Sequence, residues 1–93
     1  MIYRMHRKQN NMLGQLEILA QRLGVQVMYE KILDDGPKQG AMGTWRGQKL
    51  ILVDSRLPDD ERIEVLRREL QRLDLDEIYM TPALREFLLE RKG

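Results

Sequence analysis

Cysteine is absent from this sequence of 93 residues. Its absence excludes disulfide bonds, thiolate metal sites and cysteine nucleophiles together, because all three depend on the Sγ atom. The lack of cysteine fits a reducing compartment, and we expect a cytoplasmic location. Aromatic residues make up only 5% of the chain, so the core must be built from Leu, Ile, Val and Met. Such a core is small, and association with a partner would add buried area.

Histidine and serine each occur once, as His6 and Ser55. A zinc site needs three or four His, Cys or carboxylate donors, and His6 is far in sequence from any acidic cluster. The consecutive acids Asp59, Asp60 and Glu61 point in different directions on a helix, where they complement its dipole. A nucleophilic triad would have to bring the single histidine to the single serine. We therefore expect no metal, no cofactor, no catalytic residues and no small-molecule substrate.

A charge excess of one sign and a long apolar run are also missing. The net charge of +1 gives no general attraction to nucleic acid or to a membrane surface. The longest apolar run is 50–53, with four residues. A membrane-spanning helix needs about 18 or more. The four glycines between Gly36 and Gly47 match neither the dinucleotide-binding nor the P-loop spacing. We expect no membrane partner and no nucleotide site.

Three segments have the pattern of helices. Apolar residues recur at helical spacing over 11–23, and Gly24 follows as a C-terminal glycine should. A second helix is predicted to begin with Pro58 in its first turn and to end near Asp74. A third helix follows Thr81, whose side chain is suited to cap its N-terminus, with a proline directly after it.

Three further segments have the pattern of strands. Residues 25–29 alternate in character and include β-branched and aromatic side chains. Segments 41–46 and 49–53 flank Gly47, which supplies the positive φ of a tight turn, and this order predicts a β-hairpin. The second arm is apolar on both faces near its middle, so we expect it to be the central strand. Residues 34–40 read as a loop, and 75–79 fit either a helical turn or a short extended piece.

Together these elements predict one α+β domain over residues 1–93. We expect a small antiparallel sheet of three strands, covered on one face by about three helices. Residues 1–10 either extend the first helix or form a loose basic tail.

The second helix carries an unusual pair of like charges, Arg68 and Arg72, on either side of Glu69. On a helical wheel Glu69 lies roughly 80° from the centre of the apolar face, at its boundary, and the two arginines lie near the opposite side. Arginines four residues apart repel each other unless an acid or an anion lies between them. The alternative reading is a solvated helix face, with Glu64 paired to one of the arginines that follow it. Asp76 is a second acid within reach of Arg72.

The layout of residues 16–89 resembles the N-terminal part of the ImmA/IrrE-type metallopeptidase domains, a minimal zincin group. The resemblance rests on the helix and strand at 16–27, the hairpin ending at 50–54 and the helix at 60–70. In that family the helix carries His-Glu-x-x-His. Here the run is Arg68-Glu69-Leu70-Gln71-Arg72, and arginine has no lone pair to bind zinc. The resemblance implies an inactive relative or an independent small domain of zincin-like layout, with no zinc-bound water for Glu69 to activate.

We therefore predict a non-catalytic domain that acts through protein–protein contacts, including self-association as a homodimer. The candidate interaction residues are Arg68, Arg72, Glu69, Trp45 and Arg46. Trp45 is either half-buried against the second helix or an exposed anchor for a partner.

A metal-independent anion or nucleic-acid site is the alternative prediction. It would use Arg68, Arg72 and the basic N-terminus, whose candidate contacts are Arg4, His6, Arg7 and Lys8. A basic terminus without a wider basic face is more often simply solvated.

Overall fold

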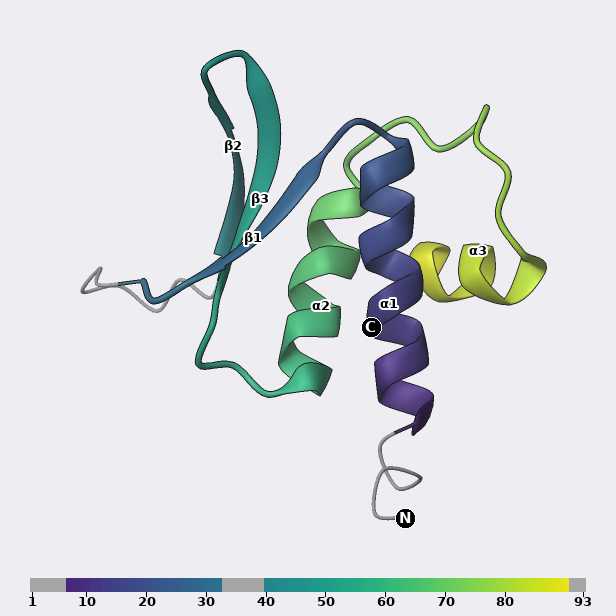
Figure 1. Cartoon of the computed structure of the whole chain (residues 1–93). Helices are drawn as coiled ribbons and strands as arrows, with labels where there is room; N and C mark the ends of the chain where they lie inside the picture. The colour runs from purple at the N-terminus through teal and green to yellow at the C-terminus, as the bar shows by residue number, and fades with distance from the viewer. Residues whose placement is uncertain (1–6, 33–39, 91–93) are drawn as a thin grey trace.

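The computed structural model describes residues 7–32 and 40–90, with the side chains of residues 11–32 and 40–90. The elements follow in the order α1 (Arg7–Arg22), β1 (Gln26–Glu30), β2 (Gly40–Trp45), β3 (Gln48–Asp54), α2 (Asp59–Leu70) and α3 (Pro82–Leu89). The three strands form one layer, and the helices lie together on one side of it (Figure 1). The predicted α+β class is confirmed. None of the described helices is long and apolar enough to cross a membrane.

The sheet is mixed, with the strand order β1-β3-β2. The central position predicted for β3 is confirmed, but the expectation of a purely antiparallel sheet is wrong. β2 and β3 form the predicted antiparallel hairpin, with Met42 opposite Ile51, whereas β1 runs parallel to β3, with Val27 opposite Ile51. The hairpin brings β3 back between β1 and β2. Because β2 runs opposite to β1, the strand that returns from it must run parallel to β1.

The two faces of the sheet differ because successive side chains of a strand alternate. One face, the covered face, packs on the helices. It consists of Val27, Tyr29, Gly40, Met42, Ile51 and Val53. The opposite face, the open face, has no helix over it in the described part of the chain (Figure 1). Its residues are Gln26, Met28 and Glu30 of β1, Ala41, Gly43 and Trp45 of β2, and Gln48, Leu50, Leu52 and Asp54 of β3.

Most helix boundaries lie within a few residues of those predicted. α1 begins at Arg7, so residues 7–10 extend the helix, which is one of the two possibilities given for the N-terminal residues. Gly24 ends it with φ of 78°, as the left-handed C-terminal position requires. Thr81 caps α3 by accepting a hydrogen bond from the Leu84 N–H, which confirms that prediction. Residues 75–79 contain a turn at 76–77, in which the Ile78 N–H donates to the Leu75 oxygen at 3.4 Å, and no strand, so the turn is the closer of the two expected possibilities.

α2 departs most from the sequence pattern. It ends at Leu70 rather than near Asp74, and Pro58 precedes it as the N-cap residue. Its buried residues extend beyond the apolar ones to Arg67 and Glu69, because the helix is packed between α1 and the sheet. Val65 lies close to Gly40 of β2, so that a Cβ at Gly40 would meet Val65 Cγ1 at 2.8 Å. This close contact brings the Glu69 side of α2 under the sheet.

The core is aliphatic, as the shortage of aromatic residues requires. Leu16, Ile51, Leu66 and Leu70 are fully buried at its centre, where α1, β3 and α2 meet. Leu88 of α3 is equally buried. The core therefore lies entirely on the helix side of the sheet.

Candidate functional site

The Arg68–Arg72 pair is neutralised from within its own helix. The Glu69 side chain is only 5% exposed, and its carboxylate accepts from Arg68 Nε at 3.1 Å and from Arg72 Nη1 at 3.5 Å. The expectation that Glu69 is a boundary residue is wrong, because α2 is covered on the sheet side as well as on the α1 side. Both arginine side chains are exposed, as predicted, and Glu69 is the acid that lies between them.

Arg68 has a second task in the fold. Its Nη2 donates to the main-chain oxygen of Gly40 at 3.1 Å, which ties α2 to the start of β2. Arg72 instead borders a shallow depression of about 320 Å³ between the hairpin and the C-terminal end of α2, lined also by Met42, Thr44 and Lys49. The two arginines thus face different surroundings rather than one shared anion pocket.

Arg67, which sequence reasoning did not single out, is buried to 4% exposure. Its guanidinium pairs with Glu64 at 3.2 Å and with the Glu90 carboxylate at 3.7 Å, and it lies 4.8 Å from the centre of the Phe87 ring. These contacts join α2 to the end of α3. The predicted pairing of Glu64 with an arginine of the same helix is confirmed for Arg67. Its position next to Leu66 was the only sequence signal for burial.

No three His, Cys, Asp or Glu side chains lie close enough to share a metal ion in the described ranges 11–32 and 40–90. Glu69, the residue that the resemblance to the zincin motif singled out, is engaged by two guanidinium groups. An acid held in this way is a structural anchor for Arg68 and Arg72.

The hairpin tip presents an aromatic residue with a cation stacked on it. Trp45 is 60% exposed, and Arg46 Cζ lies 4.5 Å from the centre of its ring. Of the two possibilities raised by the sequence, Trp45 is therefore the exposed one. The tight turn consists of Arg46 and Gly47, with φ of 54° and 78°, so Gly47 has the predicted positive φ and Arg46 shares it. The turn holds both side chains at the end of the sheet.

Trp45 continues into an apolar surface that the sequence analysis did not identify. On the open face, Met28 of β1, Leu52 of β3 and Ala41 of β2 stand side by side in register. Leu50 follows on the same face beside Gly43. These leucines and Met28 are half-buried, and none of them belongs to the core. The signal was present in the four apolar residues of β3, which alternation distributes to both faces.

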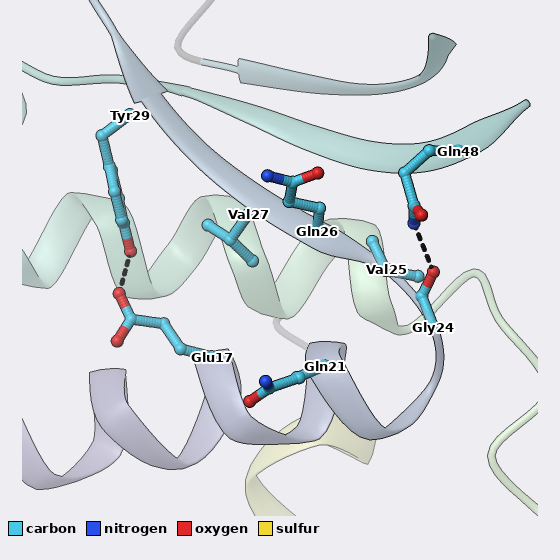
Figure 2. Close-up of a pocket in the computed structure, with 8 residues that line it drawn as sticks. All are labelled: Glu17, Gln21, Gly24, Val25, Gln26, Val27, Tyr29 and Gln48. Atoms are coloured by element: carbon cyan, nitrogen blue, oxygen red, sulfur yellow. Dashed lines mark hydrogen bonds between the residues drawn. The ribbon is translucent and has the colours of Figure 1, made fainter. Parts of the chain in front are cut away.

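A groove of about 560 Å³ lies on the other side of the sheet, between α1 and β1 (Figure 2). Val25 and Val27 project into it from the strand, and Glu17 and Gln21 border it from the helix. The Tyr29 hydroxyl donates to the Glu17 carboxylate at one end. Burial, and then this hydrogen bond, raise the pKa of Tyr29 above its ordinary value. The phenol therefore stays protonated and keeps Glu17 in place.

Asp54, at the end of β3, is a second engaged carboxylate. It accepts from the Arg56 main-chain N–H at 3.0 Å, from Nε at 3.0 Å and from Nη2 at 2.7 Å. These hydrogen bonds lower the pKa of Asp54 from 3.8 to about 2. Arg56 Nη2 also donates to the main-chain oxygen of Ile32 at 2.8 Å, which fixes the chain after β1. The Asp54–Arg56 pair therefore connects the end of β3 to the chain that follows β1.

The side chains of the basic N-terminal candidates lie outside the part of the chain that the structure describes. Arg4 and His6 precede the described residues, and Arg7 and Lys8 lie in the first turn of α1 without described side chains. The nucleic-acid contacts predicted there remain a prediction. The structure does not bring Arg68 and Arg72 to the Trp45–Arg46 tip in any common depression among the described residues.

No protein-family model, no curated protein and no solved structure matches this chain. The resemblance to the ImmA/IrrE-type domains therefore stays a prediction. Function follows from the geometry of the described surfaces.

Proposed function

We propose that this protein is a non-catalytic interaction domain that forms a homodimer through the open face of its sheet. The observation that carries the proposal is the apolar row across three strands, Met28, Leu52 and Ala41, with Leu50 and Trp45 beside it. A continuous apolar surface of this kind on a small domain marks an interaction site. On the covered face Ile51 and Val53 are fully buried, whereas Leu50 and Leu52 on the open face still have area left to bury.

The chemistry of the open face suits association. Trp45 is a large side chain with few rotatable bonds, the type that most often anchors a protein interface. Ala41 and Gly43 on β2 are small, and nothing lies within 4 Å of a Cβ placed at Gly43. Larger side chains from an opposing surface can therefore approach β2 closely. Leu50, Leu52 and Met28 then supply the apolar area on the neighbouring strands.

A second copy of the chain fits this surface in charge as well as in polarity. Along the open face a cation, Arg46, lies at the hairpin end, and an acid, Glu30, lies at the opposite end of β1. Two copies related by a twofold axis across the strands would place Arg46 of each near Glu30 of the other. Such an interface uses the same patch on both copies, as dimers with twofold symmetry do. It also sets large side chains of one copy over the small residues of the other.

Sedimentation equilibrium over a range of protein concentrations tests the proposal. We expect the unaltered chain to be a dimer and Leu52→Lys to be a monomer, because the lysine would be buried without a partner in the interface. Ile18→Lys is the matched control, since Ile18 is 58% exposed on α1, away from the open face, and should leave the dimer intact. A folded, unaltered chain that stays monomeric at about 0.1 mM would refute the proposal, since even micromolar affinity gives mostly dimer there.

Charge reversal tests the orientation of the two copies. Arg46→Glu should weaken the dimer by about fivefold, the effect typical of a rim ion pair. Adding Glu30→Arg to the same chain should restore most of the loss. If each single variant weakens the dimer equally and the double variant does not restore it, the arrangement that places Arg46 of one copy near Glu30 of the other is contradicted. Association through the open face would still be supported by the effect of Leu52→Lys.

A further inference from the structure

β1 is an edge strand with main-chain groups that lack a strand partner. Its only partner strand in the described part of the chain is β3. The Ser55 N–H donates to the oxygen of Glu30 at 2.9 Å, so Glu30 directs its main-chain groups toward β3. In a parallel pair alternate residues bond to the same neighbour, so Met28 also faces β3. The N–H and C=O groups of Val27 and Tyr29 therefore point to the free edge.

The groove between α1 and β1 lies along this same strand (Figure 2). Val27 and Tyr29 of β1 share the face toward α1, and Val25, directly before the strand, lines the same groove. A strand added beside β1 would thus meet two features at once. Its main chain would pair with Val27 and Tyr29, and every second side chain would reach the groove floor. This combination is the geometry of peptide recognition by strand addition.

Both ends of the groove are closed by hydrogen bonds. At one end the Gln48 amide donates to the main-chain oxygen of Gly24 at 2.9 Å (Figure 2). At the other end the Tyr29 hydroxyl donates to Glu17. Four residue steps separate Val25 from Tyr29, which corresponds to about 13 Å of extended chain. The site therefore fits a segment of four to five residues, about the length of β1 itself.

The polar groups of the groove define the chemistry of its occupant. Among the described residues that line it, Glu17 is the only charged one. The side chain of Gln21 makes no hydrogen bond among the described residues, so its amide is free to bind a ligand's main chain. The floor, Val25 and Val27, is apolar. An occupant with apolar residues at alternate positions and a cation next to Glu17 would match all of these groups.

We propose that this groove binds an extended peptide segment that adds as a strand to the free edge of β1, with Lys or Arg beside Glu17. The site lies at the strand edge and on the helix side of the sheet, so it is independent of the dimer proposed through the open face.

The ligand-free protein offers the first test. We expect the amide protons of Val27 and Tyr29 to exchange with solvent about 100-fold faster than those of Met28 and Glu30, since only the latter pair are bonded in the sheet. Equal protection of all four would show that the edge is already occupied, and would overturn the proposal. Loss of amide signals from Val27 and Tyr29 only at high protein concentration would assign the edge to a second copy instead.

The binding test uses the labelled hexapeptide Lys-Thr-Val-Thr-Val-Thr, blocked at its C-terminus, with chemical shifts and fluorescence anisotropy as readouts. We expect shifts centred on Val27, Tyr29 and Gln21. N-methylation of one alternating set of peptide nitrogens should abolish binding and that of the other set should not, because only one set faces β1. These two peptides have the same composition and charge, so each is the control for the other.

The preference for a cation beside Glu17 is tested with a second peptide, in which Glu replaces Lys, and with the protein variant Glu17→Gln. The acidic peptide should bind about fivefold more weakly to the unaltered protein, the effect of one half-exposed ion pair and its reversal. Glu17→Gln can still accept the Tyr29 hydroxyl, so it should abolish this discrimination while the fold is kept. The peptide-site proposal is overturned by shifts confined to the open face, by equal tolerance of both N-methylated sets, or by no binding at about 1 mM peptide.

Discussion

The covered and open faces of the sheet are built from similar apolar residues but differ in how deeply these residues are buried. Ile51 and Val53 are fully buried under α1 and α2, whereas Leu50 and Leu52, their neighbours along β3, are only half-buried and lie outside the core. The difference teaches that apolar character alone does not define the core here. The helices settle on one face because Gly40 lets α2 approach β2 closely. The other face keeps its apolar residues for association, as proposed above.

Substitution at neighbouring positions of β3 should separate the two faces most strongly. Ile51→Ala is expected to lower the free energy of unfolding by about 3 kcal/mol, through lost burial and the cavity left in the packed core. Leu52→Ala should lower it by about 1 kcal/mol or less in the monomer, since the side chain is only half-buried. Urea denaturation at low protein concentration measures both. Equal losses would contradict the distinction between the faces.

Two glycines of β2 provide a second comparison. A Cβ at Gly40 would lie 2.4 Å from the main-chain oxygen of Leu52 and 2.8 Å from Val65 Cγ1, whereas one at Gly43 would meet nothing within 4 Å. Gly40→Ala should therefore destabilise the fold by about 2 kcal/mol through steric overlap with the Leu52 oxygen of β3 and with Val65 of α2. Gly43→Ala should be neutral or stabilising by about 0.5 kcal/mol, since it only restricts the unfolded chain. Thermal melts of the two variants distinguish them directly.

Substitution of the charged residues at the border of the covered face should lower the stability less than these changes. Glu69→Gln keeps the shape of the side chain but removes the acid shared by Arg68 and Arg72. We expect a loss of about 1 kcal/mol, because the two arginines stay half to mostly exposed and are partly compensated by water. Arg72→Gln is the matched control and should be close to neutral, since its side chain is 74% exposed and its contact with Glu69 is long. Urea denaturation curves of both variants test this order.

Asp54 is the last residue of β3, and by its register its side chain belongs to the open face. This side chain is nevertheless only 10% exposed, because Arg56 covers it. Its pKa is lowered from 3.8 to about 2, so the folded state favours the charged form. The stability it contributes is complete above about pH 4 and is lost as the pH falls toward 2. Unfolding measured across this range should show a shallower decline in Asp54→Asn than in the unaltered chain. Identical acid profiles would show that the pair does not contribute.

Local signals in the sequence were enough for most of the fold. Gly24 and Thr81 marked a helix end and a helix start, and both residues perform these tasks through a positive φ and a side-chain cap. The apolar run in β3 indicated the central strand. The parallel pairing of β1 was not predictable in the same way, because it depends on where the hairpin returns rather than on any residue of β1.

Among the candidate residues, too, some properties could be predicted from the sequence and others could not. The exposure of Arg68 and Arg72 followed from the helical wheel, but the burial of Glu69 and Arg67 did not. A wheel treats a helix as having one buried side, whereas α2 has neighbours in α1, the sheet and the end of α3. The groove beside β1 was likewise invisible, since Glu17, Tyr29 and Gln48 are brought together from three different elements.

By itself, the sequence determined the α+β class, the central strand and the like-charged pair Arg68 and Arg72 on either side of Glu69. These properties follow from residue type and local spacing, which do not depend on distant neighbours. Only the tertiary structure decided which face of the sheet is covered, that Glu69 neutralises its two arginines, and that β1 has a free edge above a groove. Each of these depends on which elements meet in space, because burial and pairing are properties of a contact and not of a single residue.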